Sequence, residues 1–339
     1  MRRKFTISLG ISAVCLLSRL AVAATIPVAP TESIQDAIDA ASPDDVIQLA
    51  AGTYSEHIDY GGKALTVVGE GPATFLRGIG GGPVVTFASG EGPGSVLDSV
   101  VVTDGSGDRG AGVYIDNGSS PTVIRTILFH NRARIRGSGI YVGGGSTPLI
   151  TNNLLIYNRT SGGDPHGIQI ENSAPLVINN SLVRNDSNGI LLSGPSNALI
   201  MNNMFVRNGS RGRGRGICDF SGGNARIHYN LFHRNRKSAI LTDGKDFKGI
   251  GSADKRIGLP RLFDNLSANP RFIMRNPPRL DSRKFDMTPL AVFAAEIRPR
   301  FDGRRRPAID RGNPDPMYND LDGSRNDIGF TGGPDAPLW

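Results

Sequence analysis

The feature that most constrains the fold is a repeat of about 23 residues in the middle of the chain. Five copies close on an asparagine, namely Asn131, Asn158, Asn185, Asn208 and Asn235. Their spacings of 27, 27, 23 and 27 residues fit a unit near 23 residues that often carries about four extra ones. Repeats of this length indicate a solenoid, in which each unit contacts only its neighbours.

Each unit contains three short stretches in which apolar residues alternate. In the second copy these are 139–142, 148–153 and 154–158. Alternation predicts β-strands that bury one face, and no such strand can bury that face alone. Stacking coils about 4.8 Å apart gives every strand two parallel neighbours and a shared interior. We therefore expect an all-β, single-stranded parallel β-helix. A propeller or sandwich would need longer units and antiparallel turn signals, which the sequence lacks.

The closing asparagines also have an expected structural role. Asparagine tolerates the left-handed conformation that sharp corners require. Identical side chains stacked coil upon coil can also form a hydrogen-bonded ladder. Both roles are expected at the strand ends.

The two ends of the chain differ from the repeats. Residues 1–23 have a basic start, an apolar run and the small residues Ala21 and Ala23, which predicts a signal peptide cut after Ala23. Residues 24–243 are expected to form the β-helix, with an amphipathic N-terminal capping helix near 32–40 that covers the open strand edges. Residues 244–339 are less periodic and are expected to form irregular final coils and a C-terminal cap, within a single domain.

These features predict a secreted or periplasmic protein that has no membrane span once the signal is removed. The formal charge of the whole chain is +7, and the signal contains four basic and no acidic residues, so the mature chain has +3. Only local clustering of charge can therefore indicate an anionic partner. The sequence does not indicate an oligomeric state.

Local basic clusters lie in the extra segments 132–138, 159–166 and 209–215, which all fall between a closing asparagine and the next glycine. Arginine binds carboxylates through paired hydrogen bonds, so an extended acidic polysaccharide is the expected partner, and loops that only face water are the alternative. Nucleic acid is not expected, because the basic run lacks interleaved aromatic residues. The predicted binding arginines are Arg132, Arg134, Arg136, Arg211, Arg213 and Arg215.

The strand after each extra segment should point alternate residues outward, in columns that run along the rod. One predicted column is Tyr114, Tyr141, Gln169, Leu191 and Cys218, and the next is Asp116, Gly143, Glu171, Ser193 and Phe220. We expect Tyr114 and Tyr141 to stack on sugar rings and Gln169 to contact the same ligand. Glu171, with His166 and Asp164 near it in sequence, forms the candidate catalytic group.

Three parts of the sequence resemble the pectate-lyase-like superfamily of secreted bacterial β-helix proteins. They are the opening 33–54, the Gly-Ile-x-Ile and Ile-x-Asn-Asn units, and the ending 307–329, which together span nearly the whole mature chain. The resemblance implies right-handed coils and a substrate groove bordered by the extra segments. The superfamily includes lyases, hydrolases, epimerases, esterases and non-catalytic surface proteins, so the fold does not settle the reaction.

A shorter motif resembles the alginate C5-epimerases, which carry Asp-Pro-His before such a strand. The resemblance implies proton transfer by His166 and charge positioning by Asp164. Two departures weaken it, since Gly167 replaces an acid and Ser161 replaces a tyrosine. A turn formed by Asp164 and Pro165 is the alternative.

Other chemistries have weaker signals. A hydrolase could use Asp164 or Glu171 with Asp219 from a neighbouring coil. No metal ligands are predicted in the candidate site. Calcium is the one cofactor that the composition suggests, through an oxygen-rich tail that turn chemistry explains equally well. This tail contains Asp315, Asn319, Asp320, Asp322, Asn326 and Asp327.

The sequence thus predicts an exported β-helix whose extra segments line a face that engages an acidic polysaccharide. If the protein is an enzyme, lyase or epimerase chemistry at C5 is expected. A non-catalytic envelope or surface protein that only binds glycan or a partner is the alternative.

Overall fold

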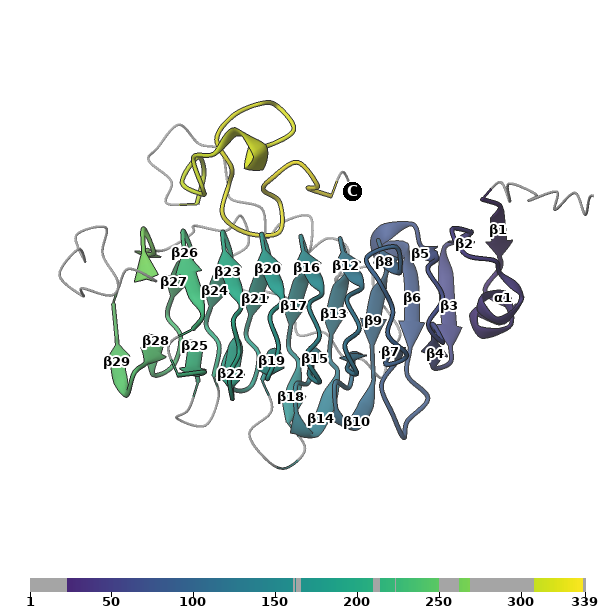
Figure 1. Cartoon of the computed structure of the whole chain (residues 1–339), viewed down its shortest axis with the longest axis horizontal. Helices are drawn as coiled ribbons and strands as arrows, with labels where there is room; N and C mark the ends of the chain where they lie inside the picture. Colours follow the sequence, from purple (N-terminus) through teal and green to yellow (C-terminus); the bar gives the residue numbers. More distant parts are fainter. Residues whose placement is uncertain are drawn as a thin grey trace, which may run out of the picture.

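The chain coils into a rod-shaped parallel β-helix, as the repeat predicted, and its coils are right-handed, as the resemblance implied (Figure 1). The computed structural model describes residues 23–160, 162, 166–209, 214–222, 224–249, 262–268 and 308–337. The predicted signal peptide, apart from Ala23, lies outside this part. None of the helices that the structure describes has the length and apolar composition needed to cross a membrane.

Three long sheets run along the rod, and a short fourth sheet lies at one corner. Sheet A contains β1 (Thr25–Val28), β2 (Val46–Leu49), β5 (Thr66–Val68), β8 (Val96–Asp98), β12 (Thr122–Ile124), β16 (Leu149–Thr151), β20 (Leu176–Ile178), β23 (Leu199–Met201), β26 (Arg226–His228) and β30 (Leu262–Phe263). Sheet B contains β3 (Gly52–Ser55), β6 (Thr74–Arg77), β9 (Val101–Thr103), β13 (Ile127–Phe129), β17 (Leu154–Ile156), β21 (Ser181–Val183), β24 (Met204–Val206), β27 (Leu231–His233) and β31 (Leu266–Ser267).

Sheet C carries the face on which the candidate site was predicted. It contains β4 (Ile58–Asp59), β7 (Val85–Phe87), β11 (Val113–Ile115), β15 (Ile140–Val142), β19 (Ile168–Glu171), β22 (Ile190–Ser193), β25 (Arg215–Phe220), β28 (Ser238–Thr242) and β29 (Lys245–Phe247). Sheet D lies between sheets B and C and contains β10 (Ser106–Arg109), β14 (Arg132–Arg136) and β18 (Arg159–Thr160). All named strand pairs are parallel except β28 with β29, which closes the last described coil of sheet C with an antiparallel strand.

The interior consists of side chains stacked coil upon coil. Ile115, Val142, Ile170 and Leu192 occupy the same register position in successive strands of sheet C, and all are fully buried. Glycine precedes these strands because neighbouring coils approach closely there. At Gly139 an added Cβ would lie 2.6 Å from the carbonyl oxygen of Gly167, which explains the glycine in each repeat.

The predicted asparagine ladder is confirmed, and the structure contains a second ladder as well. The closing asparagines 131, 158, 185, 208 and 235 are joined in series by amide hydrogen bonds of 3.0–3.1 Å. A second series at the corner between sheets A and B joins residues 153, 180, 203, 230 and 265 at 3.0–3.1 Å. Each ladder satisfies buried backbone groups at a corner where strand pairing is interrupted.

The left-handed conformation belongs to a different residue from the one expected. At the corner between sheets B and C, the residue before the ladder asparagine has positive φ, as in Tyr157 at 54° and Arg184 at 53°. At the corner between sheets A and B that residue is Asn152, Asn179 or Asn202 in three coils. The ladder asparagine is therefore selected for its amide hydrogen bonds, and its neighbour makes the corner.

The predicted helix is present as α1 (Ile34–Ala40), which follows β1 at the N-terminal end of the rod. The Ser33 side chain caps it by accepting a hydrogen bond from the Asp36 N–H. Ile34 and Ile38 join the core of the first coils. Two short 3₁₀ turns complete the described elements, η1 (Gly71–Ala73) and η3 (Pro316–Tyr318).

The expectation of a C-terminal cap is wrong for residues 308–337, which lie along the side of the rod, away from its end (Figure 1, yellow). Ile328 and Phe330 pack on outward apolar side chains of sheet B, including Phe129 and Ile156. The Asn152 amide donates hydrogen bonds to the carbonyl groups of Phe330 and Gly332. Sheet B exposes a second apolar face here, so burying that face decides where the tail lies.

We expect Asn180→Ala to lower the free energy of unfolding by about 3 kcal/mol, because several buried groups would lose their partner. The Asn180 amide accepts from the backbone and side chain of Asn153 and donates to Ile150, Ile178 and Asn203. Urea denaturation measures the change. The exposed Asn224→Ala is the control and should stay within about 0.5 kcal/mol of the unaltered protein. Equal effects of both substitutions would contradict a structural role for the ladder.

Docking of the tail should weaken as the pH rises. Burial, with the charges of Asp320, Asp310 and Asp322, raises the pKa of Asp327 to about 7. A raised pKa means that the folded state holds this proton more tightly than the unfolded chain does. Protonated Asp327 therefore stabilises the docked tail fully below about pH 4, and this stabilisation is lost as the pH rises through about 7. Protection of the amides of residues 328–333 against hydrogen exchange should fall over this range. Asp327→Asn should remove the dependence, whereas the exposed Asp315→Asn should retain it.

Candidate functional site

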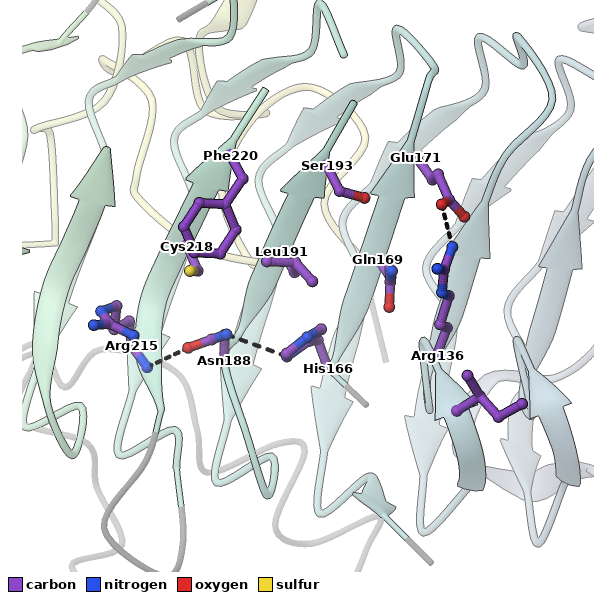
Figure 2. A pocket seen from close by; sticks show the side chains of 11 residues that line it. Arg136, His166, Gln169, Glu171, Asn188, Leu191, Ser193, Arg215, Cys218 and Phe220 are labelled. Carbon is purple, nitrogen blue, oxygen red and sulfur yellow. Dashed lines mark hydrogen bonds and ion pairs between the residues drawn. The ribbon is translucent and has the colours of Figure 1, made fainter. Parts of the chain in front are cut away.

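A pocket of about 420 Å³ lies on the outer face of sheet C, where β14 rises beside it (Figure 2). Strands β19, β22 and β25, from three successive coils, and the residues just before β19 and β22 supply rows of side chains that cross the coils. The rows are His166, Asn188 and Arg215; Gln169, Leu191 and Cys218; and Glu171, Ser193 and Phe220. The pocket therefore follows the outward columns that the sequence predicted.

Two of the predicted extra segments, 132–138 and 159–166, gather at one corner and pair there as β14 and β18 of sheet D, next to β10 from the preceding coil. Residues 210–213 of the third segment lie outside the described residues. Ser106, Arg132 and Arg159 occupy one register position across β10, β14 and β18. Ala133 of β14 is buried within sheet D, while Ile135 and Arg136 of the same strand face the pocket. Strand pairing makes the wall regular, although the sequence suggested only loops.

The best-defined polar group of the pocket is formed by Arg136 and Glu171, with Tyr141 beside them outside the lining. Arg136 forms an ion pair with Glu171, and the Tyr141 hydroxyl donates a hydrogen bond of 2.8 Å to the same carboxylate. Burial opposes the charge of Glu171, but the hydrogen bonds from Arg136 and Tyr141 together lower its pKa. Glu171 is therefore an ionised carboxylate held by two donors. This arrangement suits ligand binding better than proton transfer.

The two predicted sugar-stacking tyrosines are stacked on each other. The Tyr114 and Tyr141 rings are nearly parallel, with centroids 5.4 Å apart. Tyr141 is only 2% exposed, and the Arg109 guanidinium lies 5.6 Å from its ring centroid. Burial and the Asp116 carboxylate raise the pKa of Tyr114 to about 12. A sugar ring thus has little access to Tyr141 in this conformation.

Phe220 is the accessible aromatic side chain that the sequence reasoning placed in an outward column without assigning it a role. It is 60% exposed at the end of β25 and lines the pocket (Figure 2). An exposed aromatic face beside polar groups suits contact with a sugar ring. The sequence could not predict its exposure, because a repeat pattern gives the direction of a side chain and does not show which other residues bury it.

Most of the predicted arginines that the structure describes have acidic partners. Arg134 contacts Asp108 at 2.6 Å, with both side chains largely exposed. Arg215 makes two hydrogen bonds to Asp246, of 2.6 and 2.9 Å. Arg132 is exposed on β14. Arg211 and Arg213 lie outside the described residues. The net positive charge near the pocket is therefore smaller than the sequence suggested.

His166 lies at the base of the pocket and is 3% exposed. The Arg215 backbone N–H donates to Asn188 Oδ1 at 2.8 Å, which leaves Asn188 Nδ2 facing His166 Nδ1 at 3.2 Å. An amide nitrogen only donates, so Nδ1 is the acceptor and the neutral ring carries its proton on Nε2. Asp164, its predicted partner, lies outside the described residues.

The predicted catalytic residues do not all meet at one point. His166 precedes β19 and Glu171 ends it, so about five extended residues, roughly 15 Å of chain, lie between them. Gln169 lies between the two and is 4% exposed. The pocket brings Glu171 to Arg136 and His166 to Asn188, as two separate polar groups.

The suggested hydrolase pair with Asp219 is wrong. Asp219 shares the register position of Leu192 and points into the rod, where Ser221 and Thr242 donate hydrogen bonds to it. Outward and inward positions alternate along β25, so its carboxylate lies on the other side of the sheet from Glu171.

The described residues contain no cluster of three or more histidine, cysteine or acidic side chains arranged to hold a metal ion. In the oxygen-rich tail, Asp320 accepts hydrogen bonds from the backbone of Asp327 and Gly333. Asp327 in turn accepts from the Asp310 N–H. These contacts join separate parts of the tail, whereas Asp315 and Asp322 accept from the backbone two residues further on, as in turns.

Comparison with known proteins supports the fold. Residues 99–250 match the family model of the right-handed β-helix region. The crystal structure of pectate lyase Pel9A aligns with a TM-score of 0.50 and 15% identity, over 91% of this chain and 96% of that one. No curated protein matches the sequence.

Two further solved structures align less closely. A mannuronic acid specific polysaccharide family 6 lyase from human gut microbiota has a TM-score of 0.41 and 12% identity, over 66% of this chain and 70% of that one. An alginate lyase from Paenibacillus sp. str. FPU-7 has a TM-score of 0.35 and 16% identity, over 64% and 80%. The repeat, the sheet topology, the family-model match and the Pel9A alignment agree that this chain has the right-handed parallel β-helix fold, similar to that of pectate lyase Pel9A.

Proposed function

We propose that this protein binds an extended acidic polysaccharide across sheet C, with one sugar held in the pocket. The observation that carries the proposal is the combination in one pocket of the exposed Phe220 ring and the Arg136–Glu171 pair. Phe220 offers a face to a sugar ring, and Arg136 offers a guanidinium to a carboxylate. Because the pocket spans three coils, an extended chain suits it better than a compact ligand.

The pair of Arg136 and Glu171 gives the site a defined electrostatic role. Glu171 holds the guanidinium in place, and a uronate carboxylate would compete with Glu171 for the same donors. The pKa of Glu171 is lowered, so the pair stays ionised across the neutral range. Specificity for an acidic sugar would then come from exchanging one carboxylate partner of Arg136 for another.

C5 lyase or epimerase chemistry is the second candidate function, and the observation that favours it is His166 in the same pocket. The solved structures named above are lyases that act on pectate or alginate, which supports a uronate as the substrate class. Neutral His166 with its proton on Nε2 suits donation to a substrate oxygen, while removal of the C5 proton needs a separate base. Export to the periplasm or beyond remains part of the proposal.

An assay with a panel of uronates separates binding from catalysis. Polygalacturonate and alginate are incubated with the protein while absorbance of unsaturated product and exchange of the C5 proton are followed. Affinity electrophoresis on the same polymers reports binding. We expect retarded migration on at least one uronate. Binding without product or exchange supports the non-catalytic function, and neither binding nor product on any uronate would overturn the proposal.

Phe220→Ala should weaken binding of the retarding polymer about fivefold, because it removes roughly 1 kcal/mol of aromatic contact. Leu176→Ala is the matched control, since Leu176 is also an exposed apolar residue but lies on sheet A. Its affinity should equal that of the unaltered protein. Equal losses in the two variants would place the sugar elsewhere.

Glu171→Gln tests the exchange of partners at Arg136. The substitution keeps the shape but removes the competing charge, so affinity for a uronate should rise several-fold while affinity for neutral glycans stays unchanged. If turnover occurs and Glu171 takes part in it, product formation should instead fall by about a hundredfold or more. Weaker binding with no change in turnover would argue against both roles.

A further inference from the structure

Three arginines form a column along the corner between sheets B and C, outside the pocket. Arg184, Arg207 and Arg234 each follow the last residue of β21, β24 and β27. All three have positive φ, between 51° and 54°, which turns their side chains out of the rod at the corner. Arg184 and Arg207 are half-buried, and Arg234 is exposed.

Strand pairing fixes the spacing of this column. The Arg184 N–H donates to the Val206 carbonyl at 3.0 Å, and the Arg207 N–H donates to the His233 carbonyl at 2.9 Å. Successive arginines are therefore one coil apart, about 4.8 Å along the rod. A regular line of three guanidinium groups is thus built into the repeat.

The charges of the column are not neutralised by the chain itself. Within the described residues, none of the three arginines forms an ion pair with a carboxylate. Arg184 contacts the Tyr157 hydroxyl at 3.2 Å and lies over its ring. Burial, and then the flanking Arg184 and Arg234, lower the pKa of Arg207. Like charges are therefore held together without a counterion from these residues.

In earlier coils, the residues at this position include an acidic one, and their charge is balanced by neighbouring side chains. The position of Arg184 is taken by Asp104 and His130 in two of them, and Asp104 contacts both His130 and Arg77. In the neighbouring column, Asp186 lies one coil from the exposed Arg159 and two coils from Arg236. Within the column of Arg184, three consecutive arginines therefore occur only in its last three described coils.

We propose that Arg184, Arg207 and Arg234 form a second binding line for a linear polyuronate, separate from the pocket on sheet C. The inference rests on the proposed function for its ligand class but on different residues. A polyuronate repeats one carboxylate per sugar along an extended chain, at intervals comparable to the coil spacing. Guanidinium groups pair with carboxylates through two hydrogen bonds. Single-stranded nucleic acid fits less well, because Tyr157 is covered by Arg184 and is not a free stacking surface.

The test replaces all three arginines by asparagine, which removes the charge and tolerates the left-handed backbone at these corners. We expect the triple variant to bind long polygalacturonate or alginate about tenfold more weakly at low salt. The difference should shrink as salt is added. The triple Arg→Lys variant should keep part of the affinity, because it retains charge but loses paired hydrogen bonds.

A triple variant of the exposed Arg226, Lys245 and Lys248 to glutamine removes the same charge elsewhere and is the matched control. Equal losses in the control and in the column variant would reduce the effect to net charge and overturn the inference. So would displacement of the polyuronate from the column by oligothymidylate at equal charge.

Failure of the inference and failure of the proposed function have different signatures. If Phe220→Ala weakens binding and the column variant does not, only the pocket binds. If the column variant weakens binding and Phe220→Ala does not, the second line stands and the proposed pocket function fails. A uronate trisaccharide, too short to span both regions, should be insensitive to the column variant if it binds in the pocket.

Discussion

Register between coils is the constraint on which the rest of the structure depends. A parallel stack repeats every side chain about 4.8 Å further along the rod, so any residue type that recurs in the sequence becomes a column. Corners interrupt strand pairing and would leave buried amides unsatisfied. The asparagine ladders at two corners supply those hydrogen bonds, and they also hold successive coils in one register. Without that register neither the pocket nor the arginine column would exist.

The role of a column of side chains depends on the side of the sheet that it occupies. On the inner side they make a buried stack of apolar residues, and on the outer side of sheet C they make the pocket. Asp219 shows how strict this division is, since it lies within a pocket strand but faces the interior. Sheet B has apolar residues on both sides, and the tail with Ile328 and Phe330 covers the outer one. None of the described tail residues lines the pocket on sheet C, which leaves the pocket for a ligand.

Ion pairs within the chain decide which basic residues can bind an anionic ligand. Arg134 and Arg215 have carboxylates from neighbouring segments, and Arg136 shares Glu171 with Tyr141. The column of Arg184, Arg207 and Arg234 carries no such partner among the described residues. A high density of arginine in the sequence therefore does not by itself identify the residues that bind an anion. Their neighbours across the coils decide it.

The sequence by itself determined the β-helix, the corner at which the extra segments gather and the outward columns, because these follow from a local repeat. It also predicted the asparagine ladder, because identical residues at one register position must meet. Only the tertiary structure decided that Tyr114 and Tyr141 stack on each other, that Phe220 stays exposed and that the tail lies along sheet B. These outcomes depend on contacts between residues from different coils or from the distant tail, at separations that no local pattern encodes. The pairing of Arg136 with Glu171 is of the same kind, since the end of β14 meets β19 of the following coil.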